Sequence, residues 1–330
     1  MSISIRRSLL LALATVAIGL SMPIQAQTWP TRPITIIVPF DAGGMNDRIA
    51  RIAAPFLTKE LGQPVTVINK PGAGAMLGHI ALLKSDDGHT IAMTGVDRIP
   101  LNIQLANAAF GLQDFDTLNL SSGDYSQMIV NNDSTIKSAK DVLERLRRDP
   151  KSVSFAVQSG GTDIINLNIW LRSVGVDPAQ VRIMTTTGGG PTRNSVLGQV
   201  VDVAVVGAEG NIPLRDRVRG ILLFADQRES AWRDTPTNVE FARDQRLTSN
   251  DWVPGSQRTW TLSTAFAKAN PTVRSRWVAA LEKVHKDPEV LDAFRKANID
   301  ITWLGAERTS KLYLQGSNNI VKYVDLIRKP

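Results

Sequence analysis

Residues 34–44 read Ile-Thr-Ile-Ile-Val-Pro-Phe-Asp-Ala-Gly-Gly, and residues 65–74 read Val-Thr-Val-Ile-Asn-Lys-Pro-Gly-Ala-Gly. Each stretch begins with β-branched residues that favour a strand, passes into a glycine-rich turn and precedes a helical run. Free backbone N–H groups and the positive end of the helix dipole meet at such turns. Two turns of this kind that converge would therefore hold a carboxylate without any charged side chain.

The N-terminus has the pattern of a secretory signal peptide. Arg6 and Arg7 precede an apolar run over residues 8–20, and residues 24–26 form an acceptable cleavage site. We therefore expect residues 1–26 to be removed and the mature chain to begin at Gln27 in the periplasm. The apolar run is short for a membrane-spanning helix, although an uncleaved anchor stays open as an alternative.

Composition excludes several classes of protein. The chain has no cysteine, which excludes disulfides and thiolate chemistry, and its 43% of hydrophobic residues supply an ordinary core. The formal net charge is +7, with basic and acidic residues interleaved and few aromatics. This pattern indicates a solvated basic surface that favours anionic ligands, and it does not resemble a nucleic-acid groove. His79, His89 and His285 lie far apart in the sequence, so we expect neither a metal site nor a cofactor.

Strand-like and helical runs alternate along the mature chain. The expected strands cover residues 91–94, 127–130, 153–157, 181–185, 201–206 and 221–225. The expected helices cover residues 48–61, 138–148, 163–174, 191–197, 271–287, 288–297 and 306–327. This alternation is typical of α/β proteins with parallel sheets, and a mature chain of about 300 residues suggests two lobes. Ligands bind at the carboxyl ends of the strands in such sheets.

Several short motifs together resemble a known family. They are Trp29-Pro30-Thr31-Arg32-Pro33, Val38-Pro39-Phe40, Gly43-Gly44-Met45-Asn46-Asp47, Leu61-Gly62-Gln63-Pro64, Asn69-Lys70-Pro71-Gly72-Ala73-Gly74, Asp87-Gly88-His89-Thr90, Ser159-Gly160-Gly161-Thr162, Leu197-Gly198-Gln199 and Asp234-Thr235-Pro236-Thr237. Their order and spacing closely resemble the Bug family, the periplasmic substrate-binding receptors of tripartite tricarboxylate transporters. The likeness covers essentially the whole mature chain and is strongest in its first third.

The resemblance implies a fold and a function. The fold would be a two-lobed, flytrap-like α/β architecture of the type II periplasmic-binding-protein class. Lobe 1 would comprise residues 27–128 and 260–330, including the C-terminal helices, lobe 2 would comprise residues 129–259, and two crossings would lie near residues 126–132 and 256–263. The function would be capture of a small organic anion, a mono- or dicarboxylate, and its delivery to the membrane components of a tripartite tricarboxylate transporter. A monomer is the expected state.

The resemblance places one ligand carboxylate against the first two loops, which would bind it through backbone groups and water. The positions carried over are Phe40, Asp41, Ala42, Gly43, Gly44 and Asn46 on the first loop, with Gly72, Ala73 and Gly74 on the second. The glycines would let the backbone approach the anion, and Phe40 would wall the cleft. Alternatively, the glycines only make tight turns. For Asp47 we expect a role in capping the first helix.

Polar residues after two later strands are candidates for the far end of the ligand. Ser159, Gly160, Gly161 and Thr162 form one strand-to-helix turn, and Thr186, Thr187 and Gly188 form a further wall. Ordinary hydroxyl capping explains both sets equally well.

Some positions depart from the family pattern. Ile165 and Ile169 stand where members usually have histidine and glutamate, and Thr186 and Thr187 replace a usual tyrosine and lysine. An acidic residue expected after the strand that follows Asp202 is also replaced. The second lobe therefore lacks several polar groups of typical members.

Two charged residues are additions to the pattern. An inward Arg98 would pair a carboxylate bidentately, whereas an inward Asp41 would disfavour a second anion and accept an amine. The alternative is that both side chains pair with other residues or with water. We hypothesise that Arg98 contacts the ligand.

Three other interpretations stay open at this stage. Residues 72–78 fit a GxGxxxG dinucleotide loop, but that loop follows the second strand of an exported chain, so an enzyme is disfavoured and no catalytic residue is assigned. An orphan receptor that presents its ligand to a membrane sensor would share the same pocket. Trp232, Trp252 and Trp260 could stack on an aromatic ligand, although tryptophan is more often simply packed.

Overall fold

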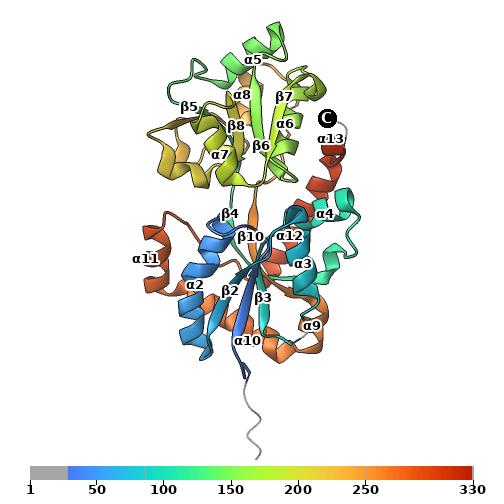
Figure 1. The fold of residues 1–330 in the computed structure, drawn as a ribbon, viewed down its shortest axis with the longest axis vertical. Helices are drawn as coiled ribbons and strands as arrows, with labels where there is room; N and C mark the ends of the chain where they lie inside the picture. Colours follow the sequence, from blue (N-terminus) through green and yellow to red (C-terminus); the bar gives the residue numbers. More distant parts are fainter. Residues whose placement is uncertain (1–28, 86, 250, 329–330) are drawn as a thin grey trace, which may run out of the picture. The chain divides into compact units, whose positions relative to one another are not determined.

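The fold contains two five-stranded sheets, each covered by helices (Figure 1). The computed structural model describes residues 29–85, 87–249 and 251–328. The signal peptide expected over residues 1–26 lies outside these residues. Among the helices described, none is long and apolar enough to cross a membrane.

The first sheet has the strand order β2-β1-β3-β10-β4. The bounds are β1 Ile34–Val38, β2 Val65–Asn69, β3 Thr90–Gly95, β4 Phe115–Gly123 and β10 Gln257–Ser263. Strand β1 is parallel to β2 and β3, whereas β10 is antiparallel to β3 and β4. The β1 sequence is almost entirely apolar because helices cover both faces of the sheet at its centre.

In the part of the chain that the structure describes, seven α-helices pack around the first sheet. Their bounds are α2 Met45–Leu61, α3 Met76–Leu83, α4 Arg98–Ala106, α9 Thr264–Ala269, α10 Pro271–Lys286, α11 Pro288–Lys296 and α12 Ala306–Tyr323. The first of them, α2, ends at Gly62, which has a left-handed φ of 70° and donates its N–H to Thr58 O. A glycine in this conformation is a common helix stop.

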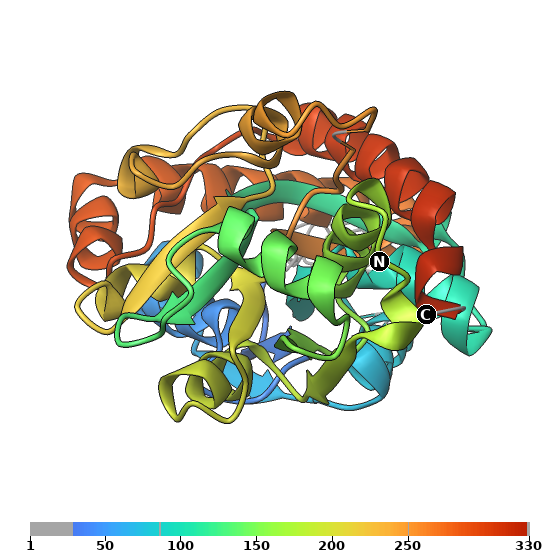
Figure 2. The same ribbon diagram turned by 90° about the horizontal axis from the view of Figure 1, so that it is seen from above.

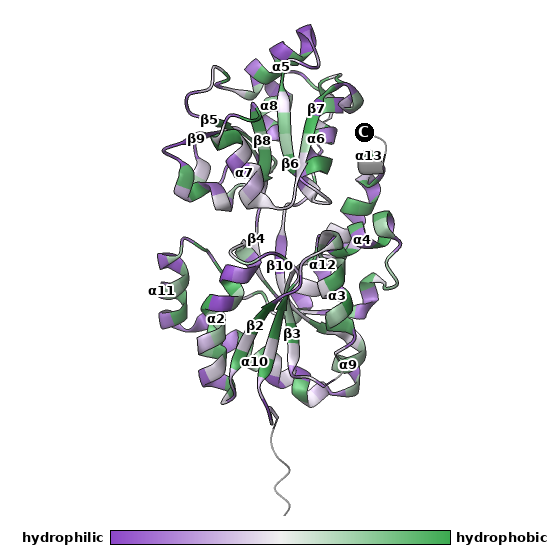
Figure 3. Ribbon diagram, viewed as in Figure 1, coloured by the Kyte–Doolittle hydropathy of each residue, from purple (hydrophilic) through white to green (hydrophobic). Residues whose placement is uncertain are grey.

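The second sheet has the order β7-β6-β8-β5-β9. The bounds are β5 Ser126–Asn131, β6 Ser154–Gln158, β7 Arg182–Thr186, β8 Val203–Gly207 and β9 Val218–Leu223, with helices α5 Ala139–Arg148, α6 Thr162–Ser173, α7 Gly189–Leu197 and α8 Asn238–Asp244. Strand β6 is parallel to β7 and β8, and β5 is antiparallel to β8 and β9. The strands of both sheets are coloured as largely hydrophobic in Figure 3, whereas hydrophilic residues gather on helices such as α5.

The chain passes between the sheets at two places. Strand β4 of the first sheet and β5 of the second are separated only by Asp124 and Tyr125, and the chain returns at Ser256, just before β10. The two passages run side by side, since Asp124 N donates to Ser256 O over 3.0 Å. The crossing expected near residues 126–132 is therefore wrong, because that segment pairs with β8 and β9 inside the second sheet. The expected lobe borders at 128 and 260 likewise fall within β5 and β10.

The C-terminal helices mainly pack around the first sheet. Helices α10 and α11 pack on α2, and α12 packs on β4 and α4. The last helix, α13 (Asp325–Arg328), instead contacts α6 beside the second sheet (Figures 1 and 2). Asn168 of α6 donates to Leu326 O over 2.7 Å.

Candidate functional site

The expected site residues follow the carboxyl ends of parallel strands in both sheets. In the first sheet β1, β2 and β3 end together, and in the second sheet β6, β7 and β8 do so. The two edges meet: Arg98, just after β3, donates from Nη1 to Ser159 O, just after β6, over 3.1 Å. Ligands of α/β sheets bind at such carboxyl ends.

The first loop is held from behind by a polar cluster. Asp47 accepts the Gly43 N–H over 2.8 Å and the Asn69 side chain over 2.9 Å, and Asn69 also donates to Phe40 O over 3.0 Å. Burial by itself raises the pKa of Asp47, but hydrogen bonds from Arg51, Gly43 and Asn69 outweigh it and lower that pKa. Asp47 therefore steadies the loop, in keeping with the capping role expected from the sequence.

The remaining first-loop residues differ in exposure. Asp41, Ala42, Gly43 and Gly44 are exposed, Phe40 is part-buried, and Asn46 is buried with its amide 3.5 Å from Met93 O. Phe40 packs near Gly95, since a Cβ there would lie 3.4 Å from Phe40 Cζ, close to ordinary van der Waals contact. The loop thus offers backbone to solvent beside one aromatic ring.

The second loop has an unusual backbone. Residues 72–75 have successive φ values of 125°, 46°, 62° and 80°, although Ala73 and Ala75 are not glycine. Non-glycine residues in this region are uncommon and concentrate at functional sites. Among the described residues, the N–H groups of Ala73 and Gly74 donate to no acceptor. Successive N–H groups in such turns form anion-binding concavities.

One helix connects the second loop to the second lobe. Asn102 on α4 donates to Gly74 O over 3.1 Å, and its Oδ1 lies 3.2 Å from His79 Nδ1. His79 also bonds Thr94 through Nε2 at 2.7 Å, and burial lowers the pKa of His79 to about 4. His79 is therefore neutral and makes two hydrogen bonds. It fixes the position of Asn102, and Asn102 in turn holds the second loop. Arg98 lies four residues earlier, on the same helix face.

Arg98 bridges the two lobes in this structure. The residue is 3% exposed, with its Nε 3.3 Å from Asp97 Oδ2. Its Nη1 donates to Ser159 O and Gly160 O. Burial raises the pKa of Asp97, and the neighbouring Arg98 opposes that rise. Arg98 therefore engages protein groups, which is the alternative that the sequence left open, and its contact with a ligand stays a hypothesis.

The turn after β6 is shaped to receive Arg98. Gly160 has a φ of 60°, and a Cβ on Gly161 would lie 3.0 Å from Arg98 Nη2. Ser159 is exposed and Thr162 is buried at the start of α6. A side chain at position 161 would thus crowd the Arg98 guanidinium, which would have to shift by a few tenths of an ångström.

The turn after β7 is organised by hydroxyl groups. Thr186 Oγ1 lies 2.6 Å from Thr192 Oγ1, and Thr192 donates to Gly188 O over 2.9 Å. Thr187 is exposed, and Gly188 precedes the first residue of α7. Thr186 thus has local partners, but its hydroxyl does not cap α7, which begins after Gly188 without a side-chain cap.

The two isoleucines that depart from the family pattern have a packing role. Ile165 and Ile169 of α6 are 0% and 6% exposed, and they form an apolar cluster with residues of α4, α12 and the returning crossing. The other buried members are Leu101, Val253, Ile320 and Val324. Where typical members have polar groups, this chain therefore joins elements of both lobes by apolar contact.

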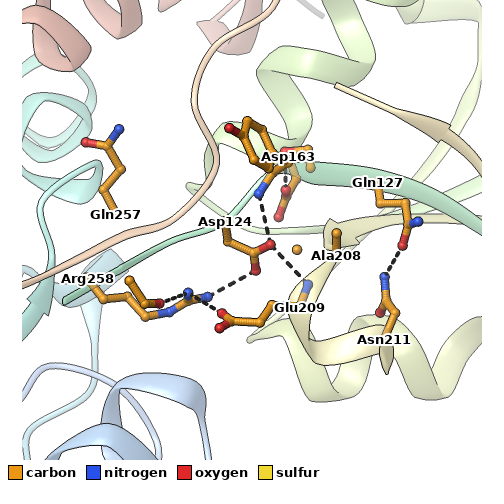
Figure 4. Close-up of polar contacts among 12 residues, drawn as sticks. Asp124, Gln127, Asp163, Ala208, Glu209, Asn211, Gln257 and Arg258 are labelled. Atoms are coloured by element: carbon orange, nitrogen blue, oxygen red, sulfur yellow. Dashed lines mark hydrogen bonds and ion pairs between the residues drawn. The ribbon is translucent and has the colours of Figure 1, made fainter. Parts of the chain in front are cut away.

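Sequence reasoning missed a buried ionic network at the crossings (Figure 4). Arg258, 5% exposed, donates to Ser122 and Glu209 over 2.8 Å each and to Asp124 over 3.2 Å. Asp124 also accepts the Glu209 N–H over 3.1 Å. Glu209 and Asp124 lie 49 and 134 positions from Arg258, so no local pattern in the sequence connects them.

A second polar group fastens α6 to both crossings. Ser126 Oγ donates to Asp163 over 2.6 Å, and Asn166 donates to Ser126 over 2.9 Å. Asn166 also exchanges two hydrogen bonds with the Val253 backbone, at 2.8 and 2.9 Å. Burial raises the pKa of Asp163 to about 6.

The tryptophans are accounted for by packing and hydrogen bonds. Trp260 is fully buried in β10, Trp232 donates to Ala208 O over 3.2 Å, and Trp252 donates to Asp226 over 3.1 Å. Within residues 29–328 as described, no group of three or more acidic or histidine side chains could hold a metal ion.

One family of known proteins matches most of this chain. Residues 49–328 match the family described as tripartite tricarboxylate transporter family receptor. BugT from Bordetella pertussis is 29% identical over 240 residues, which cover 70% of this chain and 72% of BugT.

Two solved structures share the fold. MatC from Rhodopseudomonas palustris with bound malate has a TM-score of 0.73 at 20% identity, covering 91% of this chain and 100% of MatC. Rpa4515 from R. palustris with adipate has a TM-score of 0.75 at 17% identity, covering 90% and 98%. At these identities, both similarities show a shared fold and nothing more.

Proposed function

Because the chain belongs to the family of tripartite tricarboxylate transporter receptors, we propose that it captures a small organic anion between its two lobes and delivers it to a membrane transporter. The mature chain, from Gln27, would act in the periplasm after removal of residues 1–26. The expected ligand is a mono- or dicarboxylate.

The second loop carries this proposal. Residues 72–75 keep four successive positive φ values, and the N–H groups of Ala73 and Gly74 have no acceptor in the described chain. A backbone held this way by Asn102 presents donors without a counter-charge, which suits one carboxylate. The relatives with malate and adipate support the same ligand class.

The second lobe would close on the ligand from the opposite side. Ser159, Gly160, Gly161 and Thr162 follow β6, and Thr186, Thr187 and Gly188 lie at the end of β7, at the edge that meets Arg98. A ligand that contacts both edges shifts the balance toward the closed arrangement, because only differential binding moves such an equilibrium.

Thermal unfolding of the mature chain with malate, adipate and their uncharged amides tests the proposal. A carboxylate at about a hundred times its dissociation constant stabilises the folded state by roughly 2.7 kcal/mol, which raises Tm by a few degrees. The amides should have no effect. A flat response to every carboxylate, with no co-purified anion in native mass spectrometry, contradicts the proposed function.

A further inference from the structure

The C-terminal segment of the chain contacts both lobes. Helix α12 packs on β4 and α4 of the first lobe, whereas α13 contacts α6 of the second (Figures 1 and 2). Only Val324 lies between these two helices. The segment over residues 320–328, which we call the C-terminal strap, therefore passes from one lobe to the other without forming part of either crossing.

The strap presents apolar side chains to the second lobe. Ile320 and Val324, one helical turn apart, are 3% and 4% exposed, and they lie in one cluster with Ile165 and Ile169 of α6. Leu326 packs against the same cluster. Moving the strap away from α6 would expose these side chains to water, which is unfavourable.

Two hydrogen bonds also fasten the strap to the second lobe. Asn168 of α6, which is fully buried, donates to Leu326 O over 2.7 Å. Tyr323 donates its hydroxyl to Asp251 Oδ2 over 2.6 Å, in the segment that leads to the returning crossing. Loss of the first bond would leave the buried amide of Asn168 without its acceptor, which is costly. None of these four residues lies in the turns proposed to hold the ligand.

The opposite faces of the two sheets are covered by α2 in the first lobe and α7 in the second, both on the left in Figure 1. Within the described residues, no hydrogen bond or ion pair joins these two helices. The ion pair of Arg258 with Glu209 joins the lobes beside the crossings. The fastening by the strap is therefore one-sided.

We infer that the C-terminal strap holds the lobes together at α6 before any ligand binds, so that the lobes part only on the side of α2 and α7. This role rests on the proposed capture of an anion between the lobes. The strap keeps most molecules in the arrangement that the ligand requires. The apparent dissociation constant equals the intrinsic one divided by the competent fraction. Loss of the strap should therefore weaken binding of every ligand by the same factor.

A strap that only stabilises the fold makes a different prediction. Its loss would lower the thermal stability, but the folded protein would keep the same distance between the lobes and the same affinities. The discriminating quantities are therefore the interlobe distance and the dissociation constants, both measured well below Tm.

Two introduced cysteines give the interlobe distance, because the natural chain has none to compete for a spin label. Lys59→Cys on α2 and Val200→Cys after α7 change exposed residues in different lobes. Pulsed electron paramagnetic resonance then measures the distance between the two labels without ligand. With the strap intact we expect one narrow distribution of distances.

Two changes loosen the strap, and each is made with and without the label sites. Deletion of residues 325–330 removes Leu326 and leaves α12 whole, whereas Ile169→Gln places a polar group in the cluster; the deletion serves if the Gln variant does not fold. Both should give longer, broader distances and bind malate and adipate roughly fivefold or more weakly, by the same factor for each ligand that binds. Val321→Gln, at a residue of α12 that is 38% exposed, is the matched control and should change neither quantity.

The outcomes separate this inference from the proposed function. Unchanged distances in the folded strap variants overturn the strap as a restraint, whether or not a ligand binds. Longer distances with unchanged affinities overturn its link to binding. If the wild-type chain binds neither malate nor adipate nor any other carboxylate, the proposed function falls, and the distances alone still decide whether the strap holds the lobes.

Discussion

Arg258 donates from Nη1 to Glu209 Oε2 over 2.8 Å, and this ion pair joins β10 of the first sheet to the segment after β8 of the second. Both side chains are largely buried, with 6% and 14% exposed. Burial raises the pKa of Glu209 to about 7, while Arg258 acts in the opposite direction. The contact between the lobes therefore involves a carboxyl group that titrates near neutral pH.

This pKa predicts how stability changes with pH. The pKa of Glu209 rises from 4.5 to about 7 on folding, so between these values the folded state keeps a proton that the unfolded state has released. The free energy of unfolding should therefore fall as pH rises through this window, by up to about 3 kcal/mol from this group. Glu209→Gln should remove that part of the slope in urea unfolding at pH 4.5 to 7.5. The exposed control Glu144→Gln should keep it, and equal slopes in wild type and Glu209→Gln would contradict the assignment.

Loss of Arg98 should lower the free energy of unfolding, because it leaves the buried Asp97 carboxylate without its partner. Arg98→Met removes the partner of Asp97, which is 4% exposed, and the two bonds to the turn after β6. Breaking such a pair costs about 3–5 kcal/mol. The double variant with Asp97→Asn should recover part of this loss in denaturant unfolding. An Arg98→Met variant as stable as the wild type would show that the bridge contributes nothing.

Asn102 should affect both folding and binding. Asn102→Ala removes the hydrogen bond to Gly74 O and leaves His79 Nδ1 without this partner, at a cost of about 1–3 kcal/mol. Thr94→Ala removes the other partner of His79 without touching the loop and is the matched control. Both variants should unfold more easily, but only Asn102→Ala should weaken adipate binding in calorimetry. Equal adipate affinities in the two variants would contradict the role of Asn102 in holding the second loop for binding.

The cluster around Ile165 should contribute strongly to stability. Ile165 is 0% exposed among residues of α4, α6 and α12. Ile165→Ala should therefore lower the free energy of unfolding by about 2–5 kcal/mol, and Ile165→Val by about 0.5–1.5 kcal/mol. Ile68→Ala, at a side chain that is 40% exposed, is the control and should cost much less. A small effect of Ile165→Ala would mean that the cluster is not closely packed.

Regular elements with strong periodicity could be predicted from the sequence. The helix expected over residues 138–148 corresponds to α5, because its buried residues Ala139, Val142, Leu143 and Leu146 follow the helical period. The strand expected over residues 153–157 corresponds to β6, which is a short apolar run. Strand β4 was not predicted, since residues 115–123 read Phe-Asp-Thr-Leu-Asn-Leu-Ser-Ser-Gly. Asn119 is buried there because it donates to Thr302 O over 2.9 Å and accepts Leu304 N over 2.8 Å. Such tertiary compensation leaves no local signal.

Only part of the candidate site could be predicted from the sequence. Its backbone turns were found because glycines after strands are a local pattern, but Glu209 and Arg258 were not. Their roles depend on neighbours from distant segments, such as Asp124, which lies 134 positions from Arg258. The expected direction of Arg98 could not be decided either, because its acceptors lie 61 and 62 positions away.

Calorimetric titration of adipate and malate into the wild-type chain and an Ala42→Glu variant tests the central claim most directly. Ala42 is exposed on the first loop, so a carboxylate there should leave thermal unfolding unchanged while repelling a bound anion. Ala109→Glu, at another exposed alanine, controls for the added charge. The account predicts binding of at least one diacid to the wild type and the control, with roughly a tenfold or greater loss in Ala42→Glu. Equal affinity in all three proteins would contradict it.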